Sequence, residues 1–289
     1  MCPGRGEPGS AISIRGSLSV HDGLLRVGSL KLRNITMKKI FLSATLSACC
    51  FASAVAQDWG NVSGQIVATG AIPAPELLHK AGADIKDKAV CAAGDTFKDD
   101  LLIDKDSKGV ANVFVYLAKA PKNVHPDAKK PEPATVVFDQ KGCMFTPHAM
   151  VVLGGQTVEV ISSDAIAHNT HTYPLKNQPI NVLIAPNTAL GKGEKVDYKV
   201  GESLPIKVTC DFHPWMAAYW MVVDHPYAAV TDKDGKFTIP NLPVGEHEFR
   251  VWHERMGYVN RKYAVTVKKG DNALKPVEVS VDKLKGEKK

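Results

Sequence analysis

The stretch at residues 206–223 constrains the fold of this chain more than any other part of the sequence. Residues 206–210 alternate between apolar and polar side chains, and the run at 219–223 is apolar, so each predicts a strand. The turn between them carries a thiol, an imidazole and a thioether, in Cys210, His213 and Met216. We therefore expect a β-sheet protein with metal-ligating side chains gathered at one turn.

These side chains are the ligands that copper takes in electron-transfer sites, where two His and one Cys surround the metal and a Met binds weakly along the axis. The turn provides three of the four ligands, so the fourth should be a His from another loop. His168 and His171 lie upstream in the sequence His-Asn-Thr-His, between two extended segments. Because the turn alone is a weak pattern, the alternative is a buried Cys beside a His and a Met at the surface.

The order and spacing of these segments resemble the cupredoxin family, and within it the amicyanin-like proteins, which share the loop Cys-x2-His-Pro-aromatic-Met and an upstream His-Asn-x-His. The resemblance covers residues from about 135 to 224, about a third of the chain. It implies a cupredoxin domain at residues 133–225, a Greek-key β-sandwich with one type 1 (blue) copper ion. The ligands that it implies are His168, Cys210, His213 and Met216. Spacing does not decide between His168 and His171, and the resemblance favours His168. Zinc is the alternative metal, since the binding order favours copper without excluding zinc.

Three residues outside the ligand set have expected roles. The resemblance implies that Asn169 hydrogen-bonds to the loop of Cys210 and holds that ligand in place. We expect His171 to face solvent from a strand, with metal binding as the alternative. His148 departs from the cupredoxin pattern; we expect a structural surface residue, and an approach to the metal is the alternative.

Pro214 and Trp215 adjoin the ligand His213. We expect them to form an apolar rim around an exposed edge of that imidazole. Such a rim lets a redox partner dock briefly, and small, weak interfaces are typical of electron-transfer encounters. The alternative is that Trp215 packs inside the protein.

A second β pattern lies on both sides of this region, in residues 58–125 and 226–282. Residues 229–239 are typical of a strand, a tight Asp-Gly turn and another strand. The signatures Thr-Asp-x-x-Gly-x-Phe and Leu-Pro-x-Gly resemble the small transthyretin-like β-sandwiches called carboxypeptidase regulatory-like domains, whose first strand is similar to residues 60–66. The expected fold is therefore all-β, with a cupredoxin Greek-key β-sandwich inserted in or beside a transthyretin-like sandwich. One short helix is expected within residues 75–88.

The ends of the chain are expected to carry no domain. Residues 37–56 have a basic start, an apolar stretch and an Ala-Val-Ala ending, which predict a signal peptide too short for a good membrane span. The alternatives are a membrane anchor and lipid attachment at Cys49. Residues 1–36 indicate a start codon set too early, and residues 283–289 a solvated tail.

Cleavage after residue 56 would leave three cysteines, Cys91, Cys143 and Cys210. Export would place them where disulfides persist. An odd count leaves one thiol over, and Cys210 has the role of metal ligand. We therefore expect Cys91 and Cys143 to form a disulfide, with two unpaired buried cysteines as the alternative.

The net charge of +6 is concentrated at the N-terminus. Residues 1–56 hold seven basic and two acidic residues, so the remainder is nearly neutral and offers no case for binding nucleic acid. The favoured function is a periplasmic carrier of single electrons between partners such as a dehydrogenase and a c-type cytochrome, as the resemblance implies. The alternatives are copper binding or storage, and a structural β-sandwich module. An enzyme is not expected, because four protein ligands leave no open position on the metal.

Overall fold

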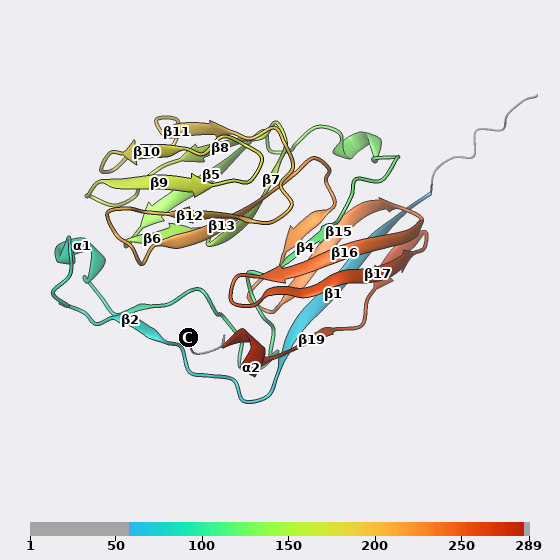
Figure 1. Ribbon diagram of the computed structural model, residues 1–289, viewed down its shortest axis with the longest axis horizontal. Coiled ribbons are helices and arrows are strands. Elements are labelled where there is room, and N and C mark those ends of the chain that lie inside the picture. The colour runs from blue at the N-terminus through green and yellow to red at the C-terminus, as the bar shows by residue number, and fades with distance from the viewer. Residues whose placement is uncertain (1–57, 286–289) are drawn as a thin grey trace, which may run out of the picture. The chain divides into compact units, whose positions relative to one another are not determined.

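The computed structural model describes residues 58–285 as strands joined by turns, with three short helical segments (Figure 1). The all-β prediction is confirmed. The expected signal peptide at residues 37–56, Cys49 and residues 1–36 lie outside the described residues. Among residues 58–285, no helix has the length and apolar character needed to cross a membrane.

One sandwich, called here the ligand-bearing sandwich, is built from two facing sheets. Its five-stranded sheet has the order β10 (Asn181–Ile184), β9 (His168–Tyr173), β12 (Ile206–Thr209), β13 (Ala217–Val223) and β7 (Ala149–Leu153). Its four-stranded sheet has the order β11 (Glu194–Asp197), β8 (Thr157–Val160), β5 (Thr135–Lys141) and β6 (Met144–Thr146). Apolar side chains from both sheets fill the core, where the Phe138 ring lies 4.8 Å from Trp220 and 4.9 Å from Phe145.

The register of this sandwich places the two ligand segments beside each other. β12 and β13 pair antiparallel with Thr209 opposite Ala217, so they enclose the loop 210–216. β9 also pairs antiparallel with β12, with His171 opposite Thr209. Continuing that antiparallel register brings the start of β9, at His168, next to the residues that follow β12.

The second sandwich, called here the split sandwich, combines strands from both ends of the described chain. β1 (Trp59–Thr69) pairs antiparallel with β15 (Lys236–Pro243) and parallel with β18 (Gly270–Ala273) and β19 (Val277–Ser280). The other sheet has the order β14 (Ala228–Val230), β4 (Phe114–Leu117), β16 (Gly245–His253) and β17 (Gly257–Val267). Both sheets therefore need strands from before and after the ligand-bearing sandwich.

Residues 70–113, between β1 and β4, follow a path that the sequence did not predict. The helix expected within residues 75–88 is wrong: β2 (Leu77–His79) pairs with β3 (Thr96–Phe97), and α1 (Lys88–Cys91) begins at the end of that range. Gly82, at φ 72°, interrupts any helix that could start at Pro75. A short 3-10 helix, Pro126–Ala128, follows later.

Two further expectations are settled by the described residues. The disulfide between Cys91 and Cys143 is confirmed. The solvated tail is wrong at its start, because α2 (Val281–Leu284) buries Leu284 in the core of the split sandwich.

Candidate metal centre

The ligand loop, residues 210–216, is closed by backbone hydrogen bonds at the end of the β12–β13 pair. The amide of Met216 donates to the carbonyl of His213 at 2.9 Å, and the amide of Cys210 donates to the carbonyl of Met216 at 3.4 Å. The loop is therefore a tight turn whose shape is set by its own backbone and by the flanking strands.

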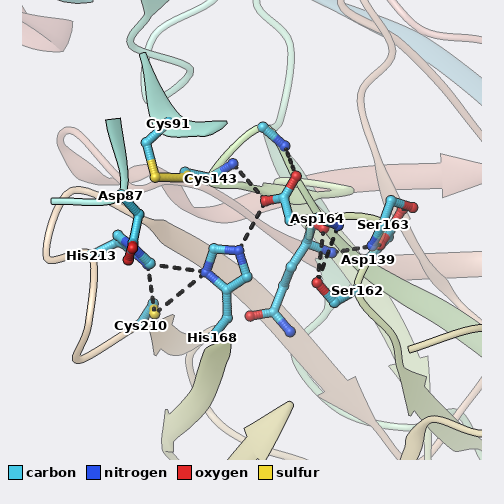
Figure 2. A network of polar contacts seen from close by, with 12 residues as sticks. Asp87, Cys91, Asp139, Cys143, Ser162, Ser163, Asp164, His168, Cys210 and His213 are labelled. Atoms are coloured by element: carbon cyan, nitrogen blue, oxygen red, sulfur yellow. Dashed lines mark hydrogen bonds and ion pairs between the residues drawn. A yellow bond between two sulfur atoms is a disulfide. The ribbon is translucent and has the colours of Figure 1, made fainter. Parts of the chain in front are cut away.

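Three of the predicted ligands converge at one point, two from this loop and one from the start of β9 (Figure 2). His168 Nδ1 and His213 Nδ1 lie 3.0 Å apart, and Cys210 Sγ lies 3.9 Å and 3.7 Å from them, respectively. Donor atoms about 2.1 Å from one metal ion are separated by roughly 3.4–3.6 Å, so this spacing suits a single ion. The side chains are buried, with exposures of 0%, 1% and 0% for His168, Cys210 and His213.

The donor set also suits copper chemically. Two imidazole nitrogens and a thiol converge, and the loop's remaining candidate, Met216, is fully buried in the same core cluster. This is the set of ligand types that blue copper sites use. Cys210 is the one free cysteine among the described residues.

The pKa shifts of Cys210 and His213 favour metal binding, whereas the shift of His168 opposes it, because a ligating imidazole must give up its proton. Burial by itself raises the pKa of Cys210, but hydrogen bonds with His168 and with nearby backbone groups lower it below its usual range. Because the thiolate is the metal-binding form, this shift favours binding. Burial lowers the pKa of His213 more strongly than the nearby Asp87 raises it, so its imidazole is neutral at neutral pH. Burial also opposes protonation of His168, but hydrogen bonds with Asp164 and Cys210 raise its pKa to about 9.

Asp164 supports His168 from the side away from the cluster (Figure 2). Its Oδ2 lies 2.9 Å from His168 Nε2, and its carboxylate accepts from the amides of Gly142 at 2.6 Å and Cys143 at 2.9 Å. Although burial raises the pKa of Asp164, these hydrogen bonds lower it overall. No role was expected for Asp164 from the sequence, where its position four residues before His168 is the available signal.

Asn169 contacts the ligand loop as the resemblance implied. Its Oδ1 accepts from the amide of Asp211 at 2.7 Å and lies 3.3 Å from Cys210 Sγ. His171 is outside the cluster: its Nδ1 lies 3.1 Å from Asp211 Oδ1, and its ring stacks on Tyr173. The structure thus brings His168 to the thiol and leaves His171 on the outer face of the sheet.

His148 is not a surface residue, contrary to expectation. It is 8% exposed, because Asp99 and Glu254 enclose it: Nδ1 lies 3.0 Å from Asp99 Oδ2, and Nε2 contacts Glu254 Oε1. Burial lowers the pKa of His148, but its pairing with these two carboxylates outweighs burial and raises the pKa to about 10. His148 therefore connects Asp99 and Glu254 and lies outside the metal cluster.

The expected apolar rim around an exposed edge of His213 is also absent. Pro214 is exposed, but Trp215 is half-buried, with its Nε1 donating to the carbonyl of Cys143 at 3.2 Å. His213 Nε2 lies 3.0 Å from Asp87 Oδ2, so a residue far away in the sequence covers the edge that the prediction left open. No local pattern could have identified Asp87.

No protein-family model and no curated protein matches this chain. Among solved structures, the copper-containing nitrite reductase from Thermus scotoductus SA-01 is 20% identical with a TM-score of 0.27, over 35% of this chain and 25% of that protein. A purple cupredoxin from Nitrosopumilus maritimus is 18% identical with a TM-score of 0.23, over 30% of this chain and 98% of its own. Amicyanin from Paracoccus versutus is 13% identical with a TM-score of 0.27, over 38% of this chain and 97% of its own.

Proposed function

We propose that this protein is an exported type 1 copper protein that carries single electrons between redox partners. The observation that carries the proposal is the buried convergence of His168 Nδ1, His213 Nδ1 and Cys210 Sγ. Met216 would be the weak axial ligand. Copper in this set would supply a one-electron couple between its cuprous and cupric forms.

The surroundings of the ligands suit rapid electron transfer. Asp164 orients His168, and Asn169 binds the loop that carries Cys210, so the ligands are held in place before the metal arrives. Ligands fixed in this way limit rearrangement when copper changes oxidation state. Four protein ligands would leave no position for a substrate, which favours a carrier over an enzyme.

Burial favours an electron carrier over a copper-storage or copper-delivery protein. A protein that exchanges copper needs its ligands to be accessible, whereas Cys210 and both imidazoles are at most 1% exposed. Electrons cross a few ångströms of protein without the ligands being exposed. A purely structural module would have no need for a neutral imidazole and a lowered thiol pKa at one point.

Export to the periplasm is part of the proposal. The disulfide between Cys91 and Cys143 is supporting evidence, because such bonds persist in oxidising compartments. Partners such as a dehydrogenase as donor and a c-type cytochrome as acceptor fit a one-electron carrier in that compartment. Intact mass of the exported protein would test the cleavage after residue 56 against lipid attachment at Cys49.

The test is the visible absorption spectrum after cupric ion is added to the metal-free protein. A thiolate bound to cupric copper gives intense charge-transfer absorption, so the protein should turn blue and should bleach on reduction. Cys210→Ser should remove this colour completely, because a hydroxyl is a poor ligand and cannot give the transition. If the wild type binds copper without colour, the electron-carrier proposal fails.

A further inference from the structure

Residues 76–100, called here the covering loop, lie against the ligand loop although they belong to the N-terminal part of the chain. At its tip, Asp87 Oδ2 lies 3.0 Å from Nε2 of the buried His213 (Figure 2). Beside this contact, Lys86 Nζ lies 4.6 Å from the centre of the Phe212 ring. The covering loop thus contacts a metal ligand and the exposed residue next to it.

The covering loop is fixed at its tip by a covalent bond. Cys91, in the helix that follows Asp87, is joined to Cys143. Ile85 and Val90 pack against the core of the ligand-bearing sandwich. The contact between Asp87 and His213 is therefore held in place from both sides.

Ion pairs hold the two ends of the covering loop together. Glu76 and Lys98 are paired by their side chains and by a backbone hydrogen bond of 2.9 Å from the Lys98 amide. Arg255, in the turn after β16, binds Asp100 at 2.7 Å and lies 3.7 Å from Glu76. These contacts link the loop to the split sandwich, which thereby has a part in building the metal centre.

The backbone of Asp87 indicates that its position serves the site. It has φ 53° and ψ 37°, a left-handed conformation that costs most L-residues about 1–2 kcal/mol and that Asp tolerates better than most. It also occupies the N-cap of α1, yet its side chain makes no capping hydrogen bond. An Asp at an N-cap ordinarily accepts from the helix amides. Here the carboxylate is turned to His213 instead.

Both ligand imidazoles therefore meet a carboxylate at Nε2: Asp164 on His168, and Asp87 on His213. The two supports are connected, because the amide of Cys143 donates to Asp164 and the sulfur of Cys143 is bonded to Cys91. With Nε2–H donating to the carboxylate, Nδ1 keeps its lone pair for the metal. A carboxylate partner also makes the imidazole a stronger electron donor.

On the basis of the proposed copper function, we infer that Asp87 is a positioning residue of the centre. Its carboxylate holds His213 with Nδ1 directed at the metal and stabilises the cupric form relative to the cuprous form. The covering loop is the device that brings this carboxylate to the imidazole. The split sandwich and the disulfide hold the loop there.

The test uses the full chain with three single substitutions. Asp87→Asn keeps the shape and tolerates the left-handed backbone, but removes the negative charge from His213. Asp87→Ala also removes the hydrogen bond. Asp84→Asn is the matched control, because it removes the same charge from the same loop at a side chain that is 97% exposed and pairs with Lys88.

The reduction potential should rise in both Asp87 variants and stay at the wild-type value in Asp84→Asn. We expect Asp87→Asn to weaken the preference for cupric over cuprous copper about tenfold, which is about 59 mV for one electron. The blue colour should persist, because all four ligands remain. Equal potentials in Asp87→Asn, Asp84→Asn and the wild type would overturn the inference.

A second measurement, on the metal-free protein, separates this inference from the copper proposal. The imidazole Nε2–H proton of His213 should be visible by nuclear magnetic resonance and exchange slowly in the wild type and in Asp84→Asn. It should exchange at least tenfold faster in Asp87→Ala. If the protein never turns blue but this difference is seen, the copper proposal fails and the Asp87–His213 contact stands. Equal exchange rates of this proton in folded Asp87→Ala and in the wild type would overturn the contact. If Asp87→Ala does not fold, the reduction potential of Asp87→Asn decides whether the inference stands.

Discussion

The ligand loop and the covering loop reach the same imidazole, but they are held in different ways. The ligand loop connects two adjacent, paired strands, and Cys210 and Met216 are buried in the core beneath it. The covering loop has two strands of two or three residues, a one-turn helix, a disulfide and surface ion pairs. We therefore expect binding of a metal to depend on the sheet, and adjustment of its properties to depend on the covering loop.

The largest effect should come from the core beneath the ligand loop. Trp220 is fully buried and lies edge-on to Phe138, so Trp220→Ala should lower the free energy of unfolding by about 3–5 kcal/mol. The control is Phe97→Ala in the covering loop, at a ring that is half-exposed, with an expected change within about 0.5 kcal/mol. Denaturant unfolding of the metal-free proteins measures both. Similar losses in the two variants would contradict the division between the loops.

Removing the disulfide should loosen the covering loop without dismantling the ligands. Cys91→Ser with Cys143→Ser should lower the free energy of unfolding by about 2–4 kcal/mol, because the unfolded chain is no longer cross-linked. Amides of residues 80–95 should exchange faster with deuterium, while the copper protein stays blue. If this variant bleaches, the covering loop is needed for copper binding, which would contradict the division of roles between the two loops. Titration of the unfolded, metal-free wild type should find one reactive thiol, Cys210.

His148 should make the anchoring of the covering loop depend on pH. Its pKa in the folded protein is raised to about 10, above the ordinary value near 6.5, because its pairing with Asp99 and Glu254 outweighs burial. The stabilisation is therefore fully present below about pH 6.5 and is lost as pH rises through about 10. His148→Gln should be less stable than the wild type by about 1–3 kcal/mol at neutral pH.

The measurement is the unfolding free energy of both metal-free proteins across this pH range. The gap between wild type and His148→Gln should narrow steadily toward pH 10, since the wild type loses its imidazolium and the variant has none to lose. A gap that is constant with pH would contradict the role of the charged imidazole.

A substitution in the ligand loop tests whether Met216 is the axial ligand. Met216→Leu should keep copper and colour but raise the potential, because a donor that stabilises the oxidised ion is lost. We expect roughly a tenfold change in the preference between oxidation states, about 59 mV. Cyclic voltammetry checks this. An unchanged potential would mean that Met216 does not act as a ligand.

The smallest effect is expected at the outer histidine. His171→Ala should leave the visible spectrum nearly unchanged, because His171 binds Asp211 and stacks on Tyr173 away from the thiol. His168→Ala, its neighbour on the same strand, should remove the colour. The opposite result would exchange the two histidines in the proposed site.

Local chemistry explains what the sequence could predict. Alternation along residues 206–210 and the apolar run at 219–223 predict strands, so the side chains between them should meet at one turn. The resemblance to cupredoxins, and not spacing, selected His168 as the fourth proposed ligand. The expectation of a split sandwich came from a resemblance, which is carried by turn signatures within residues 229–245 and by the pattern of residues 60–66. The helix expected within residues 75–88 is absent, because residues 77–79 pair as β2 with β3 about twenty positions later, a contact that the local pattern does not reveal.

The sequence by itself determined an all-β chain and the group of residues from which the proposed ligands are drawn, because strand alternation and turn composition act over a few residues. Only the tertiary structure decided which histidine meets the thiol, that His148 is enclosed by carboxylates, and that Asp87 covers His213 from 126 positions away. These outcomes depend on strand register and on a disulfide that ties distant segments together. Neither the register nor the disulfide can be recognised from a periodic pattern in the sequence, because both bring together residues that lie far apart in the chain.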